Sequence, residues 1–184
     1  PDVIHINNFN YQLTPSIIYA ANQYRKKAGK KVKIVFTAHD YQLVCPNHMM
    51  FDMQGRICED CINKGFLSCT KKGCIHGSRL KSLIGTVEAS VYKSLNTYEM
   101  IDAVICCSEF LKSKLDTNPI FTKKTIAMHN FIDSVENTNT PKENYVLYFG
   151  RYSREKGIEL ILNSKNTDYV CAGSGEYENE INNQ

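Results

Sequence analysis

The chain has 184 residues, of which 42% are hydrophobic and 22% are charged, and its formal net charge is +3. This is the composition of an ordinary globular protein, and the length suits one domain plus part of a second. The small positive charge gives no support for nucleic-acid binding. No apolar run approaches the roughly 18 residues that would span a bilayer.

Both ends of the sequence have the character of truncations. The chain opens on Pro1-Asp2 and enters a strand pattern directly, without the charged and apolar regions of a signal peptide. We therefore expect the natural start to lie upstream and the protein to be cytoplasmic. Residues 176–184 begin a polar, helix-like segment that stops without a cap.

Strand and helix patterns alternate along the first part of the chain. Val3-Ile4-His5-Ile6 predicts a buried parallel strand that ends at Asn7-Asn8. Thr14-Pro15 then supplies an N-cap and a first-turn proline for a helix that ends at Gly29. Further strands are predicted at 32–37, 103–107 and 124–128, with helices after Ser78 and at 109–115, and a long loop between 38 and 78.

The polar residues 134–144 lack periodicity and predict a linker, after which the alternation restarts. We predict a strand at 145–149, a loop at 150–157, a helix at 158–162 and a strand at 169–172. Strands separated by helices predict an α/β fold with parallel sheets that are covered on both faces. Ligands in such sheets bind beyond the carboxyl ends of the strands.

The loop from Gly150 to Gly157 carries the first chemical signal. Gly150 lets the backbone leave the strand and approach a ligand closely. Arg151 offers a planar fork for phosphate oxygens, and Lys156 offers a mobile charge near the start of the next helix. Two such cations could neutralise a diphosphate leaving group. The alternative is a solvated turn whose charges only face water.

Several segments, in the same order, resemble family 4 of the retaining glycosyltransferases, which have the GT-B fold. Phe149-Gly150-Arg151 with Glu155-Lys156-Gly157 looks like the entry to the donor domain of that family. Five further segments agree with it, namely 1–5, 36–40, 104–108, 130–133 and 170–175. Phe131 departs from the family, which usually has glycine there.

The resemblance implies a Rossmann-like acceptor-side domain at 1–133, incomplete at its start, and the truncated beginning of a second Rossmann-like, donor-binding domain at 145–184. It implies that Arg151 and Lys156 contact the diphosphate of a nucleotide-sugar, with Gly150 beside them. His39 would face the cleft near the transferred sugar or the acceptor, where we assign it positioning and charge stabilisation. The alternative for His39 is a hydrogen-bonded organiser of its loop.

The whole enzyme would transfer a hexose from the nucleotide-sugar to a glycan or lipid-linked glycan, with retention, in surface polysaccharide biosynthesis. The family's upstream glycine-rich loop and downstream acidic motif are absent from this sequence, so we expect this fragment alone to be inactive.

Five of the eight cysteines lie close together in the segment 45–77. Cys58 and Cys61 form a Cys-x-x-Cys pair, and Cys69 and Cys74 follow within 13 residues. Four such thiolates predict a closed, structural zinc site, with Cys45, His48 and His76 as substitute ligands. The alternative is a set of free thiols. A cysteine-rich insert of this kind resembles a subset of family 4 that builds surface polysaccharides.

The sequence leaves two further questions open, namely contact with a membrane and a function other than catalysis. Basic and apolar residues between Lys64 and Lys81 suit either a peripheral contact with the inner face of the membrane or a solvated basic loop. The rival to an enzyme is a non-catalytic zinc-ribbon interaction module carried on a Rossmann-like scaffold. The cysteine cluster motivates that rival.

Overall fold

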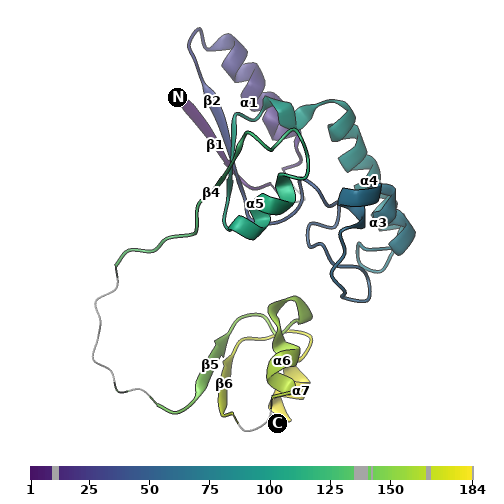
Figure 1. Cartoon of the computed structure of the whole chain (residues 1–184), viewed down its shortest axis with the longest axis vertical. Coiled ribbons are helices and arrows are strands. Elements are labelled where there is room, and N and C mark those ends of the chain that lie inside the picture. The colour runs from purple at the N-terminus through teal and green to yellow at the C-terminus, as the bar shows by residue number, and fades with distance from the viewer. Residues whose placement is uncertain (10–12, 135–140, 142, 165–166, 184) are drawn as a thin grey trace. The chain divides into compact units, whose positions relative to one another are not determined.

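The computed structural model describes residues 1–9, 13–134, 141, 143–164 and 167–183. The chain divides into two compact units, Pro1–Ile132 and Asp133–Gln184 (Figure 1). Most of the predicted linker 134–144 lies outside the described residues. Within the described part of the chain, no helix is long and apolar enough to cross a membrane.

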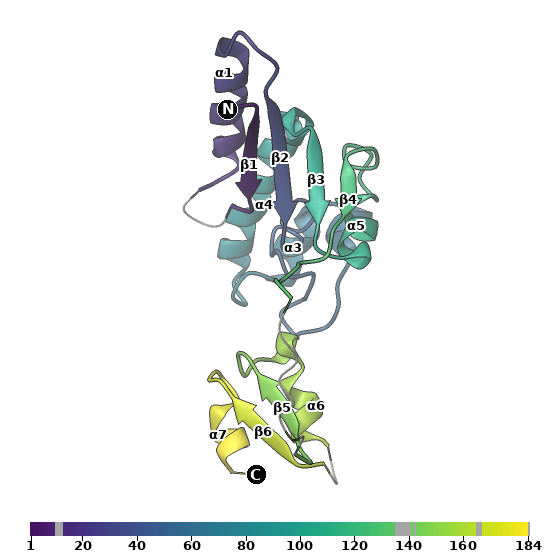
Figure 2. The same ribbon diagram turned by 90° about the vertical axis from the view of Figure 1, so that its left-hand side faces the viewer.

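The first unit is built on a parallel four-stranded sheet in the order β1-β2-β3-β4, and its strands run in the same direction in Figure 2. Ile6 pairs with Phe36, which pairs in turn with Val104. The predicted α/β fold with a Rossmann-like parallel sheet is confirmed. The strands are β1 (Val3–Asn7), β2 (Lys33–Ala38), β3 (Ala103–Cys106) and β4 (Thr125–Ala127).

Two helices of this unit, α4 and α5, start at serine caps. Ser78 Oγ accepts a hydrogen bond from Lys81 N at 3.3 Å, and Ser108 Oγ accepts one from Leu111 N at 3.1 Å. The first helix begins one residue later than predicted, because Pro15 occupies the N-cap position. The elements are α1 (Ser16–Lys27), α4 (Arg79–Ser94), the 3-10 turn η1 (Thr97–Met100) and α5 (Glu109–Leu115).

The sheet buries one face. Ile34, Phe36 and Ala38 of β2 are buried, whereas the alternate residues Val35 and Thr37 are half-buried. Figure 1 shows α1, α4 and α5 on the same side of the sheet. Right-handed crossovers between strands laid down in sequential order place every connection on one face. The expectation of a sheet covered on both faces is therefore wrong for the described residues.

The cysteine-rich segment contains two short helices, α2 (Asp60–Lys64) and α3 (Leu67–Lys72), where the sequence predicted only a long loop. It packs on α4 through hydroxyl groups. Thr70 Oγ1 donates to Thr86 Oγ1 at 2.9 Å, and Ile75 N donates to Ser82 Oγ at 2.9 Å. Ser82 and Thr86 are the buried residues of α4.

The apolar residues of α4 are exposed instead. Leu80 is 68% exposed, Ile84 63% and Val87 53%, so the helix turns its apolar stripe away from the segment that covers it. The stripe comprises Leu80, Leu83, Ile84, Val87 and Val91, with Leu95 directly after the helix. An exposed apolar stripe of this kind commonly marks a binding surface.

The second unit pairs β5 (Val146–Phe149) and β6 (Tyr169–Ala172) in parallel. Between them lie the 3-10 turn η2 (Arg154–Lys156) and α6 (Ile158–Leu162), and α7 (Glu178–Asn182) follows. The predicted strand, loop, helix and strand of this unit are confirmed to within one residue.

Candidate functional site

A hydrogen-bonded polar cluster lies at the carboxyl ends of β1 and β2. His39 directly follows β2, is exposed, and its Nε2 lies 2.8 Å from Asn7 Oδ1. Asn8 Nδ2 donates to Asp40 Oδ2 at 3.0 Å, and Asp40 Oδ1 accepts from Gln42 N at 2.9 Å. Gln42 Nε2 donates to Asn8 Oδ1 and completes the cluster.

This cluster fixes the imidazole of His39. The partner of Nε2 is an amide oxygen, so Nε2 is the donor in this hydrogen bond. Asn8 has φ +60°, a left-handed conformation that asparagine tolerates better than most residues. The cluster is therefore a preorganised polar surface at the edge where parallel sheets bind ligands.

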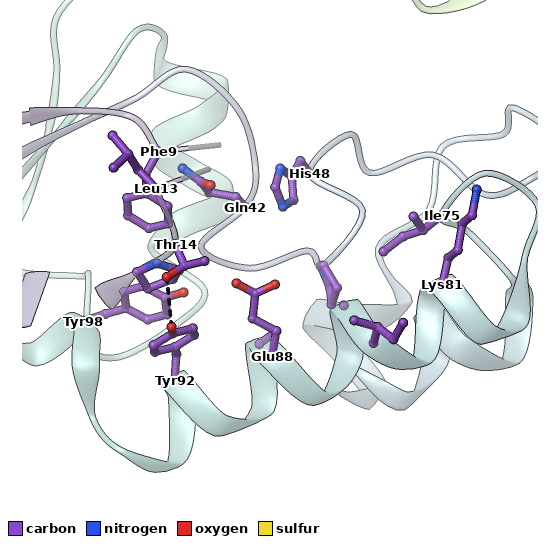
Figure 3. Close-up of a pocket in the computed structure, with 15 residues that line it drawn as sticks. Phe9, Leu13, Thr14, Gln42, His48, Ile75, Lys81, Glu88, Tyr92 and Tyr98 are labelled. Carbon is purple, nitrogen blue, oxygen red and sulfur yellow. Dashed lines mark hydrogen bonds between the residues drawn. The ribbon is translucent and has the colours of Figure 1, made fainter. Parts of the chain in front are cut away.

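A cavity of about 230 Å³ adjoins this cluster and shares Gln42 with it (Figure 3). In Figure 3 the side chains of Glu88 and His48 face each other across the cavity. Burial holds the pKa of His48 below its ordinary value, although the charges of Asp40 and Glu88 act in the opposite direction. Other lining residues include Phe9, Thr14, Pro46, Ile75, Ile84 and Tyr92.

In the second unit, glycines bring the loops after β5 and β6 together backbone to backbone. A Cβ on Gly173 would lie 1.9 Å from Gly150 O, and one on Gly175 would lie 2.4 Å from Tyr152 O. Tyr152 N donates to Ser174 O at 2.8 Å across the same contact. Gly150 itself has φ +148°, a conformation that favours glycine. These loops leave no room for a side chain between them.

The cations of this loop are exposed and loosely held. Arg151 Nη1 lies 3.6 Å from Glu155 Oε1, and the Arg151 side chain is 71% exposed. Burial raises the pKa of Glu155, but the hydrogen bond from Ser153 Oγ and the charges of Arg151 and Lys156 hold the pKa below its ordinary value. Lys156 is also exposed. Both cations are therefore available to an anionic ligand.

The residues predicted from sequence fall in different units. His39 lies in the first unit, while Gly150, Arg151 and Lys156 share one loop of the second. The sequence reasoning missed Gln42 and Glu88. The available signal was Glu88 itself, which is the acidic residue of an otherwise basic and apolar helix, α4.

The cysteines of the insert pair two by two. Cys45 hydrogen-bonds to Cys61, which together with backbone N–H groups lowers the pKa of Cys45 to about 7 against the opposing effect of burial. Cys69 and Cys74 form the second pair. Cys58 Sγ instead accepts a hydrogen bond from Lys72 Nζ at 3.2 Å. All are free thiols.

Within the described residues, no three His, Cys, Asp or Glu side chains converge on a point that suits a metal ion. The thiols pair two by two, but they are not arranged as a complete set of metal ligands. Zinc binding by Cys58, Cys61, Cys69 and Cys74 stays a prediction.

No protein-family model matches the chain. The chain is 25% identical over 185 aligned residues to a protein of Methanocaldococcus jannaschii described as an uncharacterized glycosyltransferase. The alignment covers 99% of the chain and 48% of that relative. The chain thus spans about half the length of the curated relative it matches, and nearly all of the chain is similar to a protein described as a glycosyltransferase.

Proposed function

We propose that the chain is part of a glycosyltransferase that uses a nucleotide-sugar donor. One observation carries the proposal: the glycine-built loops after β5 and β6 present Arg151 and Lys156, both exposed, at the carboxyl edge of a parallel strand pair. The similarity to a protein described as a glycosyltransferase supports it. The residue segments shared with family 4 favour the GT-B fold and transfer with retention.

In this proposal the loop stabilises the departing nucleoside diphosphate. The bond between the anomeric carbon and the diphosphate oxygen breaks, and negative charge develops on that oxygen. The acceptor hydroxyl oxygen forms the new bond to the same carbon, and its proton passes to the departing diphosphate. Arg151 can bind phosphate oxygens through two parallel N–H groups, and Lys156 adds a second positive charge on the same loop. Gly150 lets the backbone approach the diphosphate. Once the two side chains bind the diphosphate, their charges stabilise the transition state more than the ground state, because the negative charge grows as the bond breaks.

The role that we propose for His39 is positioning. Its ring is held by the hydrogen bond to Asn7, and in this proposal it contacts a hydroxyl of the acceptor or the sugar. We further propose hexosyl transfer to a glycan or lipid-linked glycan in surface polysaccharide synthesis, at the inner face of the membrane. Assay of the full-length protein with a panel of nucleotide-hexoses tests this assignment.

The loop assignment is tested with Arg151→Ala and Lys156→Ala in the full-length protein. Each is expected to lower turnover by about 100-fold or more with little loss of stability, because an exposed side chain that acts in the transition state is removed. Arg154→Ala is the matched control, because Arg154 carries the same charge in the same loop but pairs with Glu159 at 3.3 Å. Unchanged turnover in both test variants refutes the role.

We also propose that the cysteine-rich segment binds one structural zinc ion through four of its five thiols. The two hydrogen-bonded pairs, Cys45 with Cys61 and Cys69 with Cys74, support the proposal. Four protein ligands leave no open coordination position, so the ion would stabilise the segment and take no part in transfer.

A further inference from the structure

The cavity beside α4 is lined by polar groups that donate as well as groups that accept hydrogen bonds, among them His48, Gln42 and Glu88. The carboxylate of Glu88 reaches into the cavity from α4 (Figure 3). Gln42 Nε2 donates one of its two N–H groups to Asn8, so its amide group can offer a ligand both an acceptor oxygen and one N–H donor. A ligand that both donates and accepts hydrogen bonds therefore matches this end. Hydroxyl groups fit, whereas a phosphate or carboxylate would be repelled by Glu88.

Aromatic side chains stand at the same end. Tyr92 and Tyr98 lie beside Glu88 in Figure 3, and Tyr92 is fixed there by a 3.2 Å hydrogen bond from its hydroxyl to Thr14 Oγ1. Phe9 closes the wall opposite. Flat apolar surfaces next to hydrogen-bond acceptors match a sugar ring, which has apolar faces and an edge of hydroxyl donors. The volume of about 230 Å³ is below the roughly 300–1,000 Å³ of sites for drug-sized ligands, so one ring fits.

The other end of the cavity is apolar and open to the surface. Pro46, Ile75 and Ile84 line it, together with the aliphatic stem of Lys81. Ile84 is 63% exposed and belongs also to the exposed apolar stripe of α4, where Leu80 and Val87 are its neighbours one turn away. The cavity and the stripe therefore form one continuous surface that changes from polar to apolar along α4.

We propose that this cavity binds the acceptor and that the acceptor is an amphiphilic glycoside. Its sugar ring lies against Glu88 and Gln42, and its hydrocarbon chain leaves over Ile75 and Ile84 along the α4 stripe. The proposal rests on the transferase function proposed above, and it narrows the acceptor from any glycan to one that carries a hydrocarbon chain at the bound sugar.

Gly85 offers a way to change the cavity without unfolding the helix. A Cβ at Gly85 would lie 2.5 Å from Ile75 Cδ1, the end of a flexible side chain, so Gly85→Ala displaces Ile75 at the apolar end of the cavity. Alanine also has a higher helix propensity than glycine. Gly85→Ala should therefore obstruct the hydrocarbon chain while the helix is kept or strengthened.

The experiment measures binding of methyl and octyl β-glycosides of glucose, galactose and mannose to the full-length protein by ligand-detected NMR, below micelle concentrations. For the sugar that fits, the octyl form is expected to bind at least about tenfold tighter than the methyl form. Glu88→Gln should weaken the binding of both glycosides about tenfold, because a charge-assisted hydrogen-bond acceptor is lost. Ile84→Ser and Gly85→Ala should weaken the binding of the octyl glycoside and leave the binding of the methyl glycoside unchanged. Leu160→Ser, at an exposed leucine of α6, is the control.

The proposal is overturned if no glycoside binds, if octyl and methyl forms bind equally, or if Ile84→Ser behaves like Leu160→Ser. Binding of UDP and GDP to wild type and to Arg151→Ala is measured on the same samples and reports the donor loop separately. Nucleotide binding without glycoside binding refutes the acceptor cavity alone. Glycoside binding without nucleotide binding refutes the transferase and keeps the cavity as an amphiphile site.

Discussion

Asn8 Nδ2 donates a 3.0 Å hydrogen bond to Asp40 Oδ2 and so joins the carboxyl ends of two adjacent strands, β1 and β2. The same asparagine accepts from Gln42, and its backbone has φ +60°. Through these two hydrogen bonds, Asn8 connects the loop that carries His39 to Gln42 in the wall of the cavity. The backbone and the side chain of Asn8 contribute separately, and substitution can separate them.

Asn8→Ala is expected to lower the free energy of unfolding by about 2 kcal/mol, because it removes hydrogen bonds and leaves a β-carbon in a left-handed conformation. Asn8→Gly removes the same hydrogen bonds without that strain, so its loss should be smaller by about 1 kcal/mol. Urea unfolding monitored by circular dichroism gives both values. Equal losses in the two variants would show that the backbone conformation of Asn8 carries no cost.

Asp52 is expected to give the cysteine-rich segment a stability that depends on pH. Its buried carboxylate accepts from Arg56 N and Arg56 Nε, both at 2.9 Å, and from Gln54 N at 3.0 Å. The backbone hydrogen bond from Arg56 is the first cause of its lowered pKa, and the opposing effect of burial is outweighed. The folded state therefore favours the ionised form. This stabilisation is fully present above the unfolded pKa of about 3.9 and is lost as the pH falls through the lower folded value.

Asp52→Asn should cost about 1–2 kcal/mol near neutral pH, because an amide is a weaker acceptor than a carboxylate. The difference from wild type should shrink as the pH falls below about 4. Denaturant unfolding at a series of pH values measures it, with Asp133→Asn at an exposed carboxylate as the control. A difference that stays constant with pH would exclude ionisation of Asp52 as its origin.

Gly173→Ala is expected to disturb the loop pair of the second unit. The added methyl group would meet main-chain atoms of Gly150 at 1.9 Å, so the backbone must move. We expect a loss of about 1–3 kcal/mol in the stability of this unit and weaker binding of nucleoside diphosphates. Ser174→Ala in the same turn adds no atoms and serves as the matched control. Titration with UDP and thermal unfolding together make the measurement, and wild-type behaviour of Gly173→Ala would contradict the close contact.

From the proposed zinc site we expect elemental analysis to find about one zinc ion per chain. Removal by a chelator should lower the unfolding temperature, because metal binding and folding of such a segment are coupled. Replacement by Co²⁺ should give thiolate absorption bands, which Cys61→Ser should alter and Cys107→Ser, in the strand region outside the segment, should not. Protein without stoichiometric zinc that unfolds identically with and without chelator would rule the site out.

The regular elements were predictable because local signals agree with the tertiary structure. The strands β2 and β5 have apolar runs that end at polar or glycine-containing loops, and Ser78 and Ser108 cap α4 and α5. Such segments carry their pattern within a few residues. The loop bearing Arg151 and Lys156 was found in the same way, since it lies between two of these elements.

The cavity was not predictable, because it depends on how α4 is rotated about its axis. The apolar residues of α4 suggest a core-facing stripe, yet Ser82 and Thr86 face the protein and Ile84 faces outward. That rotation is fixed by Thr70 and by the backbone of Ile75, which lie on a separate segment. The side of the helix on which Glu88 projects is a property of this packing and has no signature in the spacing of the residues.

The hydroxyl contacts between α3 and α4 have a mechanical consequence. The hydrogen bonds between Thr70 and Thr86 and between Ile75 and Ser82 are directional. They therefore fix the register of the cysteine-rich segment on α4, which contact between two apolar surfaces would not do. Ile75 forms one wall of the cavity and directly follows Cys74 in the chain. The bond from Ile75 N to Ser82 therefore anchors the end of the cysteine-rich segment and this wall of the cavity to the same point of α4.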